Sequence, residues 1–205
     1  MYISHSPFWL QWIYPSVLWH KNREEKSIYL SFDDGPIPVV TPFVLNTLKT
    51  FNAKATFFCI GDNISKYPEI YQQIIDGGHA IGNHTHNHLN GWKTPDKLYL
   101  ENIEQCSKLT GLKLFRPPYG RIKRSQIKSL QKEYPGTKII MWDVLSGDFD
   151  TGIDGQKCVR NVMKHTRNGS IIVFHDSLKA FPRLEVALPN VLKQLSAKGF
   201  SFDSL

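Results

Sequence analysis

From residue 27 to the carboxyl end, short apolar runs alternate with longer stretches of helical periodicity. Seven runs rich in β-branched and aromatic residues have the length of strands: 27–32, 55–60, 79–82, 113–116, 137–142, 170–174 and the last residues from 200. Six stretches between them have the periodicity of helices: 42–51, 64–76, 95–110, 125–134, 156–166 and 184–198. Because the runs are almost continuously apolar, they fit a parallel sheet that helices cover. The alternation predicts an α/β fold, either an open sheet or a barrel.

Length favours one domain over two. A chain of 205 residues can bury one sizeable core, and no composition shift or repeat divides it. We therefore expect residues 26–205 to form a single domain and residues 1–25 to be an amino-terminal segment that packs on it. The three cysteines are too far apart for a CxxC site and too few for a disulfide framework. No GxGxxG or P-loop pattern follows the first run, which removes the usual phosphate-binding reason to prefer an open sheet.

The amino-terminal segment contains an apolar and aromatic stretch, PFWLQWIYPSVLW, at 7–19. No Lys or Arg precedes it, no small-residue cleavage site follows it, and it is too short to cross a bilayer. We therefore expect no conventional signal peptide and favour the cytoplasm, with docking on a membrane surface as the alternative. The formal net charge of +7 permits contact with nucleic acid, but the basic residues are scattered and match no recognition motif. No nucleic-acid partner is expected.

Chemically active side chains follow four of the predicted strands. The first strand ends in SFDDGP (31–36), and the third is followed by HTHNH (84–88). The next ends in RPPYG (116–120), where paired prolines stiffen the backbone, and the sixth ends in a histidine after IIVF (171–174). In a barrel, the carboxyl ends of parallel strands form one rim, and that rim carries the active site.

The histidine spacing points to a metal. His84 and His88 are four residues apart, which would place both imidazoles on one face of a helical turn, whereas His86 would point elsewhere. Together with an aspartate from SFDDGP, they describe an Asp, His, His site that leaves coordination positions open for water and substrate. Zinc is the expected ion for these ligands, and cobalt or nickel could occupy the same set.

The four motifs resemble, in order and spacing, those of the NodB-homology polysaccharide deacetylases, carbohydrate esterase family 4. The resemblance covers the chain from about residue 26 onward and implies a distorted (β/α) barrel of about seven parallel strands. It also implies a catalytic group: Asp33 as general base, Arg116 as the residue that orients it, the Tyr119 backbone N–H as an oxyanion donor, and His175 as general acid. The metal ligands would be Asp34, His84 and His88.

One motif departs from the family pattern. In WDVLSGDF (142–149), Leu145 stands where the resemblance places an aspartate that partners the catalytic imidazole. We therefore expect the pKa of His175 to lie lower than in that arrangement, unless Asp143 or Asp148 reaches it. Phe149 replaces a tryptophan, and with Val173 it would line a pocket for the acetyl methyl group. Pro118 and Tyr119 complete the expected substrate contacts.

The expected activity is metal-dependent hydrolysis of acetyl groups on N-acetylated oligo- or polysaccharides of the chitooligosaccharide or peptidoglycan type. An esterase that removes O-acetyl groups from xylan is the nearest alternative, because the same centre attacks an ester more easily than an amide. A non-catalytic sugar-binding relative is a second alternative, which Leu145 motivates.

Overall fold

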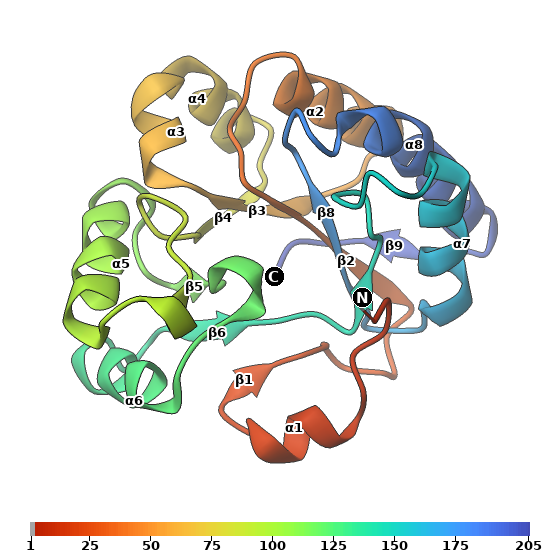
Figure 1. Ribbon diagram of the computed structural model, residues 1–205. Helices are drawn as coiled ribbons and strands as arrows, with labels where there is room; N and C mark the ends of the chain where they lie inside the picture. Colours follow the sequence, from red (N-terminus) through yellow and green to blue (C-terminus); the bar gives the residue numbers. More distant parts are fainter. Residues whose placement is uncertain (1–2) are drawn as a thin grey trace.

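Nine strands and eight α-helices make up residues 3–205, the part of the chain that the computed structural model describes (Figure 1). The strands are β1 (Val17–Leu18), β2 (Ser27–Asp33), β3 (Ala55–Cys59), β4 (Ala80–Asn83), β5 (Leu114–Phe115), β6 (Lys138–Ile140), β7 (Val144–Leu145), β8 (Ile171–His175) and β9 (Ser201–Phe202). The helices are α1 (Trp9–Ile13), α2 (Val40–Thr50), α3 (Gly61–Lys66), α4 (Pro68–Asp76), α5 (Asp96–Thr110), α6 (Arg124–Glu133), α7 (Gly155–His165) and α8 (Phe181–Ala197).

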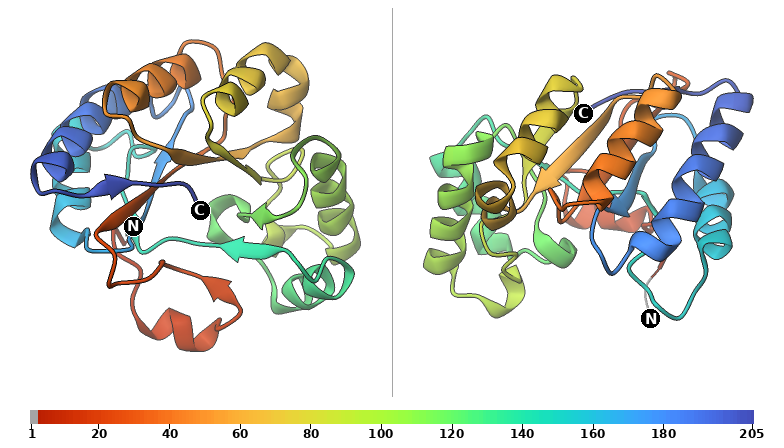
Figure 2. Two further views of the ribbon diagram at one scale, coloured as in Figure 1. Left: turned by 180° about the vertical axis from the view of Figure 1, so that it is seen from behind. Right: turned by 90° about the horizontal axis from the view of Figure 1, so that it is seen from above.

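The strands form a curled parallel sheet with helices on its outside, as Figures 1 and 2 show. Its order is β1-β6-β5-β4-β3-β2-β8-β7, with β9 paired to β2, and each strand ladder is parallel. The predicted barrel of parallel strands is confirmed. Two strands of two residues each, β1 and β7, were not predicted.

Helix α1 was not predicted, and the other helices follow the predicted stretches with one exception. The stretch 64–76 was predicted as one helix, but α3 ends at Lys66 and α4 begins at Pro68. Proline disfavours helical backbone at the residue before it and is well accepted as the first residue of a helix. The single predicted helix is therefore wrong, and Pro68 is the reason.

Side chains alternate between the two faces of β2, and this alternation positions the site. Ile28, Leu30 and Phe32 point outward into the core shared with α2, α7 and α8. Tyr29 points inward, where it packs with side chains from β3, β6 and β8. Because strand side chains repeat every two residues, the inward face also carries Asp33 at the carboxyl end.

The register of the neighbouring strand places a second reactive side chain beside the first. Asp33 pairs with His175 in the parallel ladder between β2 and β8. Ile172 and Phe174 of β8 belong to the outer core, so the alternate residues Val173 and His175 face inward. The carboxylate and the imidazole therefore stand side by side at the rim.

The amino-terminal segment closes the gap between the two edges of the sheet. At one edge β1 pairs with β6. At the other, Ser4 O accepts a hydrogen bond from Leu145 N at 2.9 Å, and Ser6 N donates to Asp143 O at 3.0 Å. Residues 4–18 therefore span from β7 to β6, with α1 on the outside (Figure 1). Among residues 3–205, no helix is both long and apolar enough to span a bilayer.

Candidate active site

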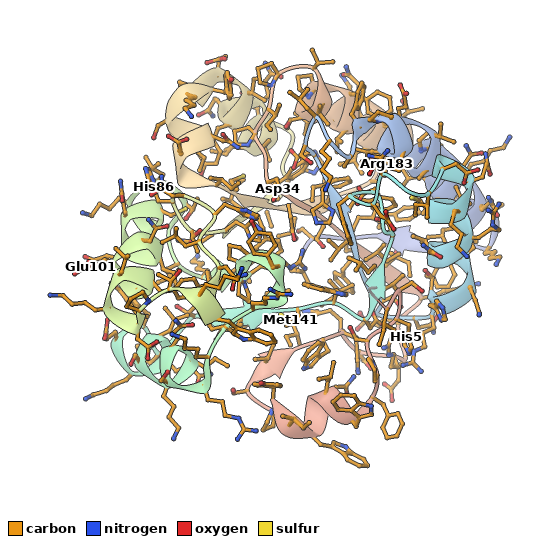
Figure 3. All side chains as sticks on the ribbon, in the orientation of Figure 1. His5, Asp34, His86, Glu101, Met141 and Arg183 are labelled. Carbon is orange, nitrogen blue, oxygen red and sulfur yellow. The ribbon has the colours of Figure 1, made fainter. Side chains whose placement is uncertain are left out.

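Three of the residues singled out from the sequence form a cluster suited to a metal ion. Ligand atoms of Asp34, His84 and His88 all lie within 4.8 Å of one another. His88 Nε2 is 3.2 Å from Asp34 Oδ1, and His84 Nε2 is 3.8 Å from the same oxygen. In Figure 3, Asp34 lies over the centre of the barrel. Burial opposes ionisation of Asp34, but His88, His175 and His84 together hold its pKa below the usual value.

The hydrogen bonds around this cluster fit a bound cation. His84 Nδ1 lies 2.8 Å from the Arg116 carbonyl oxygen, which can only accept, so Nδ1 carries the proton and Nε2 presents its lone pair. Burial lowers the pKa of His84 to about 4, so the ring is neutral near pH 7. Its lone pair faces Asp34 Oδ1, a buried oxygen without a hydrogen-bond partner among the described residues. Two electron-rich atoms facing each other in a buried site suit a positive ion between them.

The two histidines reach the cluster from an irregular loop. The predicted helical turn is absent, because Thr85 and His88 have φ angles of 63° and 55° in the left-handed region. Asn102 on α5 holds the loop, since its Oδ1 accepts hydrogen bonds from the backbone N–H groups of His86 and Asn87 at 2.9 Å each. His86 lies out toward α3 and α5, away from Asp34 (Figure 3). This role of Asn102 was not predicted from the sequence. The available signal was a polar residue within the predicted helix 95–110.

Asp33 is held by a buried arginine. Arg116 Nη1 donates to Asp33 Oδ1 at 2.7 Å and to Ser31 Oγ at the same distance. Its other nitrogens donate to the carbonyl oxygens of Ile140 and Met141, and the guanidinium carbon lies 4.0 Å above the Phe58 ring centroid. Burial lowers the pKa of Arg116, and Asp33 opposes that shift. The planar guanidinium is thus fixed on every side and fixes the carboxylate in turn.

His175 has a carboxylate partner that the sequence resemblance did not identify. Asp148 Oδ1 lies 2.8 Å from His175 Nδ1, and Asp148 Oδ2 accepts the His175 backbone N–H at 2.7 Å. Burial disfavours the imidazolium, but Asp148, Asp34 and Asp33 together outweigh burial and raise the pKa of His175 to about 10. The lowered pKa was expected only if neither Asp143 nor Asp148 reached His175, and Asp148, three positions after Leu145, supplies that charge. Asp143 is engaged elsewhere, with Arg23 at 2.7 Å.

A cavity of about 980 Å³ opens above these groups. Asp33, Asp34, His84, His88 and His175 lie among its lining residues. Of the substrate contacts expected from the sequence, Tyr119, Phe149 and Val173 also line it, whereas Pro118 is buried and does not. The Phe149 ring meets His175 edge-on, with centroids 5.3 Å apart. Tyr119 has a φ of 60°, and its ring lies against His88 with a centroid distance of 4.6 Å.

One further buried acid supports the turn that carries Asp34. Asp176 Oδ1 accepts the Gly35 backbone N–H at 3.0 Å, and its Oδ2 accepts the Thr41 hydroxyl at 2.6 Å. A side chain at position 35 would meet this carboxylate, because a Cβ built there lies 2.0 Å from Asp176 Oδ2. Position 35, directly after the two aspartates, therefore has room only for glycine, because the Asp176 carboxylate approaches its backbone closely. Sequence reasoning treated it only as a turn residue.

Comparison with known proteins identifies the family. A family model described as polysaccharide deacetylase matches residues 20–134. The chain belongs to the polysaccharide deacetylase family. It is 33% identical over 192 residues to a peptidoglycan-N-acetylglucosamine deacetylase of Bacillus cereus, covering 91% of this chain and 89% of the relative. It is 31% identical over 201 residues to a chitooligosaccharide deacetylase of Azorhizobium caulinodans, covering 89% and 94% respectively.

Solved structures of polysaccharide deacetylases have the same fold. The chain superposes on the Bc1960 peptidoglycan N-acetylglucosamine deacetylase with a TM-score of 0.88 at 32% identity, covering 98% of this chain and 95% of the other. The resemblance of its four motifs to the family is thereby confirmed.

Proposed function

We propose that the protein is a metal-dependent hydrolase that removes acetyl groups from N-acetylated glycans of the peptidoglycan or chitooligosaccharide type. One observation carries the proposal. Two oriented acid–base pairs, Asp33 with Arg116 and His175 with Asp148, flank the metal-type cluster at the floor of one cavity. Amide hydrolysis needs a base for the attacking water and an acid for the departing amine, and these pairs provide both.

The roles of the residues follow from their hydrogen bonds. A divalent cation held by Asp34, His84 and His88 would supply a Lewis acid that acidifies water and polarises the acetyl carbonyl. Asp33, which the hydrogen bond from Arg116 holds in place, accepts the proton of the attacking water. By resemblance to the family, we assign the Tyr119 backbone N–H as the donor that stabilises the acetyl carbonyl oxygen when negative charge develops on that oxygen.

The proton for the leaving amine comes from His175. Asp148 accepts the Nδ1 proton of this ring, so the Nε2 proton is the one available to the substrate. An imidazolium whose pKa is raised to about 10 stays charged throughout the neutral range. The sugar then leaves with a free amino group. The contact with Asp148 also weakens the case for a non-catalytic sugar-binding protein, because that alternative rested on the absence of a carboxylate at Leu145.

Acetate release from a panel of polymers tests the proposal. Chitooligosaccharide, peptidoglycan and acetylated xylan are incubated with protein before and after chelation, and then with Zn²⁺, Co²⁺ or Ni²⁺ restored. We expect release from the N-acetylated glycans that chelation abolishes and metal restores, and none from Asp34→Asn. Release from xylan alone would favour the O-acetyl esterase. Release that survives complete removal of metal would refute the proposed mechanism.

A further inference from the structure

Large hydrophobic side chains gather around the cavity in unusual number. Twelve of them are exposed among the described residues, and five of the twelve also line the cavity: Ile3, Trp9, Ile13, Trp92 and Tyr119. Three more are sequence neighbours of lining residues: Phe8, Trp12 and Leu178. We define these eight side chains as the apolar rim. Soluble proteins normally scatter such residues, so their collection around one opening marks an interaction surface.

The helix α1 contributes the most exposed part of this rim. Trp9, Trp12 and Ile13 stand at positions i, i+3 and i+4, so they share one face of the helix. They are 47%, 77% and 42% exposed, and the Phe8 ring meets Trp12 edge-on with centroids 5.5 Å apart. The segment is anchored from its other side, where Leu10 and Tyr14 pack against the core. The face is therefore held in place, and within residues 3–205 it stays exposed.

The charges near the rim favour an anionic partner. Residues 3–20 contain no Lys, Arg, Asp or Glu, which leaves this segment neutral apart from its histidines. Arg121 and Lys179 line the cavity, and the Arg124 guanidinium carbon lies 5.6 Å above the Tyr14 ring centroid. The acidic residues of the lining are Asp33 and Asp34, which belong to the catalytic floor. Cations beside exposed apolar side chains match an anionic membrane surface, in which negatively charged headgroups cover an apolar interior.

The composition of the rim favours a lipid surface over a sugar chain. Sugars stack on flat aromatic faces, which five of the eight rim side chains offer, whereas Ile3, Ile13 and Leu178 are aliphatic and offer none. A bilayer interface accommodates aliphatic and aromatic side chains together, and tryptophan and tyrosine favour it. We propose that the apolar rim docks the protein on an anionic phospholipid membrane, with the cavity facing the headgroup layer. This inference goes beyond the proposed function, because docking requires no catalysis.

Vesicle binding by the full chain tests the docking. Vesicles of phosphatidylglycerol and phosphatidylethanolamine are sedimented with the wild type, with Trp12→Ser and with Leu98→Ser. Leu98 is the matched control, because it is 50% exposed on α5 and does not line the cavity. We expect wild-type binding that Trp12→Ser weakens by about tenfold or more and that Leu98→Ser leaves unchanged. Substituting Arg124→Gln should weaken binding by about fivefold. Replacing phosphatidylglycerol by phosphatidylcholine removes the negative lipid charge and should weaken binding by about fivefold for each Lys or Arg that contacts the surface.

A second measurement needs no substitution. Lipids brominated near the headgroup should quench the tryptophan fluorescence of the wild type, whereas soluble brominated detergent below its micelle concentration should not. Absence of wild-type binding and quenching overturns the proposal, as does equal loss in Trp12→Ser and Leu98→Ser. If Trp12→Ser keeps vesicle binding but loses affinity for soluble chitotetraose, the rim is a sugar platform and the docking is refuted. Vesicle binding and fluorescence quenching do not depend on deacetylation, so a protein without deacetylase activity would refute the proposed function without affecting the test of docking.

Discussion

Replacing Asp148 by asparagine should separate the charge of His175 from its position. The amide keeps the size of the carboxylate and an oxygen for the His175 backbone N–H, but it loses the negative charge beside Nδ1. Asp148 makes the largest of the three carboxylate contributions that, against the effect of burial, raise the pKa of His175 to about 10. Without that charge, the pKa should fall to about 6.5 or below. At pH 8 the charged fraction of the ring would then drop from nearly all to about 3%, so kcat should fall by about 30-fold through protonation alone.

The assay is kcat against pH for metal-loaded wild type and Asp148→Asn. The alkaline limb should move to lower pH in the variant, and the rate deficit should shrink toward pH 6. A cation bound at Asp34, His84 and His88 would lower the His175 pKa in both proteins, so the comparison rests on the difference between the two pH profiles. Asp150→Asn is the control, because Asp150 accepts a hydrogen bond from Gly152 N instead of contacting His175.

The stability of the two proteins should show the same linkage. A histidine whose pKa is raised by folding stabilises the protein fully below its unfolded pKa of about 6.5, and this contribution is lost as pH rises toward 10. The difference in unfolding free energy between wild type and Asp148→Asn should therefore be largest below pH 6.5 and should shrink above it. An unmoved alkaline limb in a folded, metal-loaded variant would refute the assignment of His175 as the acid that Asp148 tunes.

Three further predictions concern the floor of the cavity. His84→Ala and His88→Ala should each lose bound divalent metal by elemental analysis, and full occupancy in either would contradict the ligand set. Asp33→Asn should keep the metal while kcat falls by about 100-fold or more, whereas Asp34→Asn should lose the metal; swapped phenotypes would mean that the two carboxylates are assigned in the wrong order. Arg116→Met should destabilise the fold by about 3–5 kcal/mol in urea unfolding, because Asp33 is left buried without its partner, and a loss below about 1 kcal/mol would argue against that ion pair in solution.

The sequence was informative where local pattern and parallel-sheet geometry coincide. Asp33 and His175 each follow an apolar run, and parallel strands bring such ends together. Their place on one rim could be predicted without knowing the strand order, whereas their side-by-side position depends on the pairing of β2 with β8. The grouping of an aspartate with His84 and His88 was predictable for the same reason, although the loop from His84 to His88 is irregular and not helical. The side chains expected as metal ligands thus lie together even though the predicted local backbone was wrong.

Other features depend on contacts that no local pattern records. Asp148 reaches His175 because the chain turns back after the short strand β7, and family spacing alone pointed to Leu145. Asn102 supports a loop fifteen residues before it in the sequence, through hydrogen bonds to backbone N–H groups that any residue would offer. The closure of the sheet by Ser4 and Ser6 joins positions more than a hundred residues apart.

Because residues 4–18 close the sheet, the cavity is built from two kinds of structure, a rigid set of strands and a strap attached at its ends. The side chains of the candidate active site stand on the central strands β2 and β8 and on the turns that follow strands, where the core fixes them. One wall of the cavity is instead a strap, joined to the edges of the sheet through β1 and a few backbone hydrogen bonds. Substitutions on the outer face of such a strap leave the register of the barrel untouched. The surface that this strap presents can therefore change independently of the candidate active site, and exchanging the strap between relatives would transplant that surface while the site stays as it is.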